Sequence, residues 1–95
     1  MIKVLMERRC KPDKGEELKK LLEELRSKAL QRDGSYSYET LRSVDDPSVW
    51  LSIAAWTFAG EWKAWQNSPE RREIISKIEP LLTEPAREST FELAR

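Results

Sequence analysis

The fold of this chain is decided by the stretch Val49-Trp50-Leu51-Ser52-Ile53-Ala54-Ala55-Trp56. Successive side chains of a β-strand point to opposite faces of a sheet. Trp50 and Trp56 therefore share one face of the expected strand, and Leu51 and Ile53 share the other. Because both faces are apolar, the sequence predicts that both are covered in the native protein.

The segment that precedes this stretch predicts two more strands and a helix. Ile2–Arg9 alternates as a strand, and Asp13 is expected to cap a helix whose leucines recur at helical spacing. Residues 35–44 are expected to form a strand with Tyr36 and Tyr38 on one face. The turn cluster at residues 45–48 then predicts a hairpin.

The segment after Trp56 predicts a helical region and a last strand. The aromatic residues expected on one side of the first helical part are Phe58, Trp62 and Trp65. Ser68 and Pro69 have the residue types of a helix start, so we expect a break in the helical region there. Arg71 and Arg72 follow and are interpreted as charges on the helix surface. Residues 87–93 are expected to form the last strand.

This order predicts one domain over residues 1–95, a ferredoxin-like βαββαβ fold of the α+β class with a four-stranded antiparallel sheet. Two helices on one face leave the other face of the sheet open. An apolar patch of that size is rare on a monomer, so we expect a homodimer whose sheets pack face to face. The sequence leaves open whether Trp50 and Trp56 face the partner or the helices, because a register slip of one residue inverts the faces.

Composition excludes several classes of function. Lys+Arg 17 and Asp+Glu 17 give a formal net charge of zero, so no nucleic-acid partner is expected. No apolar run approaches the roughly 20 residues of a membrane span, and the amino terminus lacks the pattern of a signal peptide. The single cysteine, Cys10, fits a reducing compartment and is interpreted as an inert thiol. We therefore expect a cytoplasmic protein without a membrane partner.

Metal and nucleophilic chemistry also lack their usual residues. The chain has no histidine, which excludes Ser-His-Asp and Cys-His arrangements. Only carboxylates remain as metal ligands, and the adjacent glutamates of the first helix do not converge, so no metal site is expected. With three glycines, no phosphate-binding loop is expected either.

Several short motifs, taken together with their spacing, resemble those of a known family. They are Lys14-Gly15, Trp56, Trp62, Trp65-Gln66-Asn67-Ser68 and Pro80-Leu81-Leu82-(x)2-Pro85. This arrangement resembles the antibiotic biosynthesis monooxygenase (ABM) domain family over nearly the whole chain. The resemblance implies a dimeric α+β barrel with a pocket between sheet and helices in each subunit. Activities of the family range from cofactor-independent oxidation of quinol-like aromatics to oxidative haem breakdown, and some members lack an enzymatic role.

The haem-degrading branch of the family provides a check at three positions. Its asparagine, tryptophan and haem-ligating histidine fall on Arg8, Trp65 and Ile75 of this chain. Because the histidine is missing, haem degradation by that mechanism is not expected. Haem binding without a histidine ligand stays a remote alternative.

The candidate site residues are aromatic and basic. Trp56, Trp62 and Trp65 are interpreted either as substrate-binding rings that stack a flat aromatic ligand or as ordinary core packing. Tyr36 and Tyr38 are catalytic candidates because a phenol can hydrogen-bond a quinol hydroxyl, although a base at neutral pH would need a nearby cation. Their alternative role is strand packing.

Arg8 is the third catalytic candidate. Alternation allows only one of Arg8 and Arg9 to face a given side of the strand. An arginine that faces the pocket can stabilise an enolate or phenolate, whereas an exposed one would form a surface ion pair.

The sequence therefore predicts an ABM-type monooxygenase that acts on a small aromatic or quinol-like substrate and needs no cofactor. The alternative is a non-enzymatic dimer of the same fold, which binds a small ligand or serves in assembly. The missing histidine and the absence of an evidently activated acid or base favour that alternative.

Overall fold

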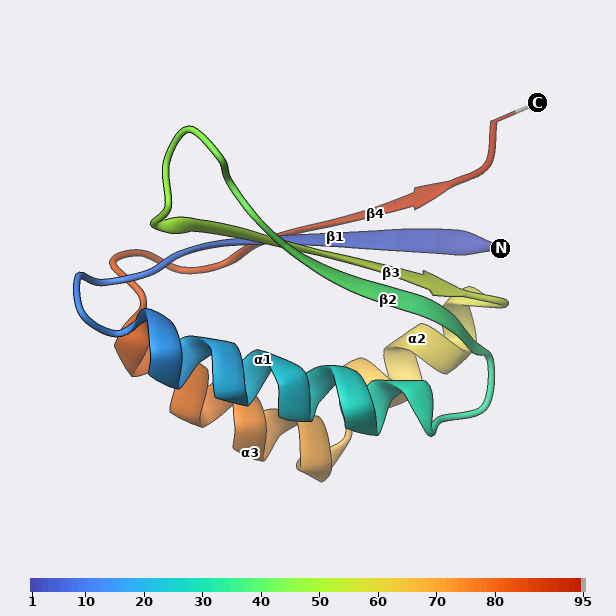
Figure 1. Cartoon of the computed structure of the whole chain (residues 1–95). Helices are drawn as coiled ribbons and strands as arrows, with labels where there is room; N and C mark the ends of the chain where they lie inside the picture. The colour runs from blue at the N-terminus through green and yellow to red at the C-terminus, as the bar shows by residue number, and fades with distance from the viewer. Residues whose placement is uncertain (95) are drawn as a thin grey trace.

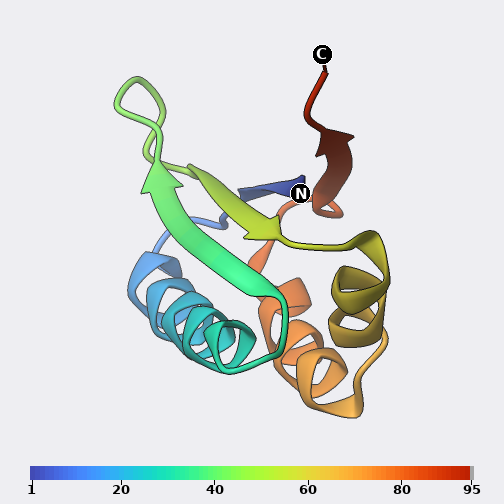
Figure 2. The ribbon, with the colours of Figure 1, turned by 90° about the vertical axis from the view of Figure 1, so that its right-hand side faces the viewer.

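The computed structural model describes residues 1–94, which form one antiparallel sheet with its helices on a single face (Figure 1). The elements in chain order are β1 (Ile2–Arg9), α1 (Gly15–Leu30), β2 (Ser35–Arg42), β3 (Val49–Trp56), α2 (Ala59–Gln66), α3 (Pro69–Ile78), the short 3-10 helix η1 (Glu79–Leu81) and β4 (Arg87–Glu92). The strand order is β2-β3-β1-β4. Seen end-on in Figure 2, α1 and α3 lie side by side beneath the strands. The ferredoxin-like α+β fold is confirmed.

The helical region breaks at the predicted position. Helix α2 ends at Gln66 and α3 begins at Pro69, and Ser68 is the N-cap residue between them. The Ser68 hydroxyl accepts a hydrogen bond from the backbone N–H of Arg71 at 3.2 Å and donates one to the carbonyl of Trp65 at 2.7 Å. The cap therefore ties the end of α2 to the first turn of α3.

Both tryptophans of β3 face the helices. The register pairs Ile2 with Trp56 and Arg8 with Trp50, and all four side chains are buried on the helix-covered side. Buried leucines of α1 and isoleucines of α3 complete this core. The question that the sequence left open is thus decided by the pairing of β3 with β1.

The opposite face of the sheet carries the side chains that alternate with the buried ones. Leu5, Leu51 and Ile53 are half-buried there, and Leu41 is exposed. No element within residues 1–94 covers this face, which is open in Figure 1. Leu5 and Ile53 are paired in the register of β1 and β3, so the apolar side chains form a continuous strip.

Three local expectations were wrong. Asp13 does not cap α1: the N-cap residue is Lys14, which makes no side-chain cap, and Asp13 has a φ of 65° in the turn before it. Phe58 precedes α2 and is exposed, because the helix begins one residue later. Strand β2 ends at Arg42, since the chain turns from Ser43 toward the hairpin.

No helix within residues 1–94 has both the length and the apolar composition needed to cross a membrane.

Candidate functional site

A cavity of about 190 Å³ lies between α3 with η1 and the start of β4. Two arginines line it, Arg8 from β1 and Arg71 from α3, together with the carboxylates of Glu79 and Glu88. The rest of the wall is mostly apolar and consists of Ile75, Ile78, Leu82, Pro85 and Ala86. The cavity therefore combines a hydrophobic wall with converging charged groups, which is the composition of a ligand site.

Arg8 reaches this cavity because of the alternation of β1. Ile2, Val4 and Met6 point to the helices, and Arg8 is the last residue in that row. Its side chain is only 3% exposed, and it forms no ion pair with any carboxylate of residues 1–94. Burial lowers the pKa of Arg8, and nearby Arg71 lowers it further, while Tyr38 and Glu88 act in the opposite direction. Arginine nevertheless keeps its charge in proteins.

Arg71 is held by three neighbours. Its guanidinium lies 5.2 Å from the ring centroid of Trp62, and its Nη2 atom is 3.5 Å from Oε2 of Glu88 and 3.8 Å from Sδ of Met6. The other carboxylate oxygen of Glu88 accepts a hydrogen bond of 2.7 Å from Gln66. Arg71 is 6% exposed, so it is a structural part of the cavity rather than the surface charge that the sequence indicated.

Tyr38 is buried in the same region, at 5% exposure. Burial raises the pKa of its phenol, and the positive charge of Arg8 offsets only part of that rise. Its hydroxyl has no hydrogen-bond partner within residues 1–94. Tyr38 therefore stays protonated at neutral pH and is suited to donate a hydrogen bond, not to act as a base.

Tyr36 does not share the environment of Tyr38. The pairing of β2 with β3 shifts between Ser35 and Ser37, so the residue between them is an extra one, as in a β-bulge. Tyr36 is 69% exposed as a result. The expectation that both tyrosines lie on one face is wrong, and Tyr36 does not line the cavity at Arg8.

The three candidate tryptophans are buried beneath the sheet. Trp56 and Trp62 form a tilted pair with ring centroids 6.1 Å apart, and Arg32 lies 5.4 Å from the ring centroid of Trp65. None of the three lines the cavity at Arg8, and Trp62 reaches it only through Arg71. Core packing accounts for these contacts, and direct substrate binding by the tryptophans stays a prediction.

Further polar atoms of the helix-facing side are buried without a partner. They are Thr40 Oγ1, Ser52 Oγ, Trp50 Nε1 and Trp56 Nε1, considered within residues 1–94. The register places Ser52 opposite Met6 and Trp50 opposite Arg8, so these two lie near the Arg8 end of β1, whereas Trp56 lies opposite Ile2 at the other end. Buried polar groups usually find partners, so each of these atoms is an exception to that rule.

Sequence reasoning missed two charged residues of the site, Arg71 and Glu88. A signal existed for Arg71, because it is in helical phase with the buried residues Ile74 and Ile78. No comparable signal existed for Glu88, since all of β4 is exposed and its pattern shows no buried row.

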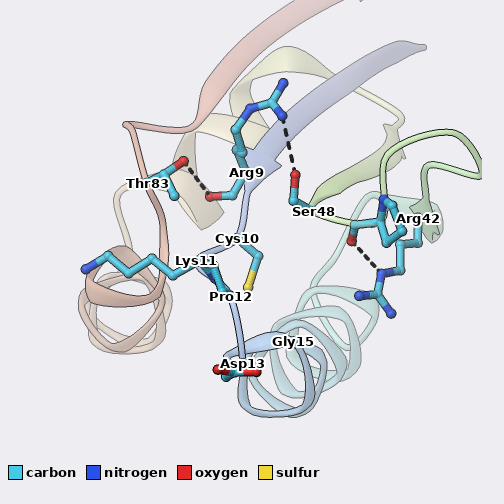
Figure 3. A pocket seen from close by; sticks show the side chains of 10 residues that line it. Arg9, Cys10, Lys11, Pro12, Asp13, Gly15, Arg42, Ser48 and Thr83 are labelled. Atoms are coloured by element: carbon cyan, nitrogen blue, oxygen red, sulfur yellow. Dashed lines mark hydrogen bonds between the residues drawn. The ribbon is translucent and has the colours of Figure 1, made fainter.

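A second cavity, of about 350 Å³, lies beside the turn that follows β1, at the same end of the strand as Arg8 (Figure 3). The Cys10 side chain points there between Arg42 and the start of α1. Arg9 is bound to Asp46 at 2.8 Å, and Arg42 donates a hydrogen bond of 2.7 Å to the carbonyl of Pro47. Burial raises the pKa of Cys10 despite the charge of Arg42, so a reactive thiolate is disfavoured.

Within residues 1–94, no three cysteine or acidic side chains come together as ligands for an ion. The chemical groups that line the cavity at Arg8 are the two arginines and the carboxylates of Glu79 and Glu88, and Tyr38 lies next to Arg8.

Comparison with known proteins places this geometry in a family. The model of the family described as antibiotic biosynthesis monooxygenase matches residues 1–77. The chain belongs to the antibiotic biosynthesis monooxygenase (ABM) family. The match includes β1, both main helical segments and the β2–β3 hairpin, so it spans the elements that carry Arg8, Tyr38 and Arg71.

Solved structures share the ABM fold over the full chain. SnoaB of Streptomyces nogalater, a cofactor-independent oxygenase, is 14% identical with a TM-score of 0.90, covering 99% of this chain and 93% of that one. Rv0793 of Mycobacterium tuberculosis is 19% identical with a TM-score of 0.91, covering 99% and 95%. At these identities the similarity establishes the fold alone.

One curated protein matches by sequence. SchA of Streptomyces halstedii is 36% identical over 47 residues, which is 50% of this chain. The match covers only 12% of the length of that protein.

Proposed function

We propose that this ABM-family protein is a cofactor-independent monooxygenase that oxidises a small aromatic, quinol-like substrate. The observation that carries the proposal is the buried Arg8, which has no ion pair within residues 1–94 and lines the cavity between helices and sheet. A preorganised cation in a water-poor site stabilises negative charge that develops on a substrate. Family membership and the oxygenase SnoaB among the similar structures support this assignment.

The proposed reaction starts with ionisation of a substrate hydroxyl next to Arg8. The guanidinium lowers the pKa of that hydroxyl so that its proton passes to solvent water, and Tyr38 donates a hydrogen bond to the resulting oxyanion. The electron-rich ring reacts with O2 at a carbon that bears hydrogen, which forms a C–O bond and a hydroperoxide. Cleavage of the O–O bond and loss of the carbon-bound proton then give a carbonyl and one water molecule. The substrate supplies all electrons, so the reaction balances as substrate plus O2 to quinone plus water.

The open face of the sheet belongs to the same proposal. Leu5, Leu51 and Ile53 form an apolar strip that no helix covers, and the exposed Leu41 extends it. Covering that strip removes apolar surface from water and stabilises association. The proposed enzyme is therefore a homodimer whose subunits meet through their sheets.

Oxygen uptake tests the assignment. Purified protein is supplied in air with a panel of hydroquinones and naphthohydroquinones, each with and without a ring carboxylate, and uptake above the uncatalysed rate is expected for at least one of them. Arg8→Met is expected to lower kcat/KM by at least about tenfold, because loss of a charge-assisted contact costs of the order of 1.5–3 kcal/mol. Arg72→Met, an exposed neighbour on the same helix as Arg71, is the matched control and should leave kcat/KM unchanged.

Absence of uptake with the whole panel would contradict the enzymatic assignment. A specific observation then favours the second candidate, a non-enzymatic ligand-binding dimer: the raised pKa of Tyr38 removes one of the few groups available as a base. Ligand-dependent quenching of tryptophan fluorescence without consumption of the ligand is the result expected for that alternative.

A further inference from the structure

The cavity at Arg8 holds more buried positive than negative charge. Arg8 and Arg71 are both more than nine-tenths buried, and only Arg71 has an ion-pair partner, Glu88. Glu79 lines the rim but is exposed and forms no ion pair with either arginine. Arg8 is thus left without an ion pair within residues 1–94, and shares the influence of the single carboxylate Glu88 with Arg71.

A buried cation without a counter-ion is unfavourable, because burial removes its hydration. Proteins compensate such charges by pairing, and within residues 1–94 Arg8 forms no ion pair, while Glu88 is already paired with Arg71. The phenol of Tyr38 lies beside Arg8 and can donate a hydrogen bond. Two buried guanidinium groups and this donor together match a ligand that carries negatively charged oxygen.

Resting on the proposed function, we infer that the substrate of this site is an anion: an aromatic ring that carries a carboxylate, which pairs with Arg8 and approaches Arg71. The planar guanidinium of arginine binds a carboxylate through two parallel hydrogen bonds. Ile75, Ile78 and Leu82 supply the apolar wall against which the ring lies. A neutral ring of the same shape packs equally well against the apolar wall but leaves the charge of Arg8 unpaired.

The size of the cavity limits the ligand further. Its volume of about 190 Å³ is below the roughly 300–1,000 Å³ of pockets that enclose drug-sized ligands. The cavity therefore accommodates the carboxylate and the ring next to it, and a larger substrate extends into the mouth between η1 and β4. This favours a compact aromatic acid over a polycyclic neutral quinol.

Glu88 is the internal competitor of such a ligand. Its carboxylate lies 3.5 Å from Arg71 and accepts a hydrogen bond from Gln66. It therefore neutralises part of the positive charge that would attract the ligand. Neutralising this side chain leaves two unopposed arginines. Glu88→Gln is therefore expected to strengthen binding of an anionic ligand and to leave binding of a neutral one unchanged.

Calorimetric titration under nitrogen tests the inference with 2-naphthoate and its neutral isostere 2-naphthamide. The wild-type dissociation constant is expected to be at least about tenfold lower for the carboxylate, the size of one charge-assisted contact. Arg8→Met should bring the two constants to within about twofold of each other. The control Arg72→Met should preserve the wild-type ratio.

Glu88→Gln provides the second measurement, because glutamine keeps the size of the side chain and removes only its charge. Naphthoate should bind about threefold or more tightly to this variant, with naphthamide unchanged. Equal affinities in the wild type, no measurable naphthoate binding, or a ratio that survives Arg8→Met would each overturn the inference. If Arg8→Met fails to fold, unchanged naphthoate binding by Glu88→Gln overturns it instead.

These outcomes are separable from the oxygenase assignment, because both ligands are inert to oxygen under nitrogen. A protein that prefers naphthoate but oxidises no quinol contradicts only the proposed reaction. A protein that oxidises quinols without any preference for the carboxylate contradicts only the anion inference.

Discussion

Tyr38 shows how burial decides the chemistry of one residue. A cation beside a phenol ordinarily favours the phenolate, and Arg8 lies close enough to do so. Desolvation is the larger effect here, so the pKa of Tyr38 is raised. The same side chain therefore acts as a hydrogen-bond donor at neutral pH and loses any role as a general base.

This shift predicts a pH-dependent stability. The unfolded phenol releases its proton near about pH 10, whereas the folded one keeps it to higher pH. Unfolding then releases a proton, so the free energy of unfolding of the wild type falls as pH rises above about 10. In Tyr38→Phe, this decrease in the free energy of unfolding should be absent. Since the hydroxyl is unpartnered, the variant should differ from the wild type by less than about 1 kcal/mol at neutral pH.

Urea unfolding at neutral and alkaline pH measures the difference. Cys10, whose pKa burial also raises, is present in both proteins and cancels from the comparison. Parallel pH profiles for the two proteins would show that Tyr38 is not responsible.

At the scale of elements, the junction of α2 and α3 positions the site. Ser68 caps α3 and holds Trp65 of α2, and the first turn of α3 carries Arg71 toward Glu88. The cap at Ser68 is therefore linked, through Arg71 and Glu88, to the charged wall of the cavity. The cap belongs to the local sequence, whereas its consequence for Arg71 depends on where α3 packs.

Replacement of this cap is expected to destabilise the protein. Ser68→Ala removes the hydrogen bond to the N–H of Arg71 and should lower the free energy of unfolding by about 1 kcal/mol. The matched control is Ser76→Ala in the same helix, where an exposed hydroxyl bonds to the carbonyl of Glu73. That change should cost less than about 0.5 kcal/mol, because alanine is the better helix former. Thermal or urea unfolding gives both values, and equal losses would argue against the cap.

At the scale of the whole molecule, one layer of helices covers only one face of the sheet (Figure 1). The uncovered face carries Leu5, Leu51 and Ile53, which a second subunit is proposed to bury. Ile53→Lys places a charge in the middle of this strip and should convert the proposed dimer into a monomer in analytical ultracentrifugation. Leu30→Lys, at the end of α1 on the helical side, is the control and should leave the dimer intact. A monomeric wild type at micromolar concentration would contradict the proposed assembly.

Local signals in the sequence were sufficient for the elements. Alternation predicted β1 and β3, helical spacing predicted α1, and Ser68 with Pro69 predicted the break before α3. These features depend on neighbours within a few residues, so they can be read without the fold. Asp13 and Tyr36 were the exceptions, because a backbone with positive φ and a shift in strand pairing leave no clear pattern in the residues themselves.

The features of the candidate site also divide into those that the local sequence determined and those that depend on the tertiary structure. The sequence by itself determined that one of Arg8 and Arg9 would face inward, and that the chain lacks histidine. Only the tertiary structure decided that Arg8 is the inward one, that Trp50 and Trp56 face the helices, and that Arg71 and Glu88 meet it from distant elements. The physical reason is that strand register and helix packing are set by contacts between residues far apart in the chain, which a local pattern does not encode.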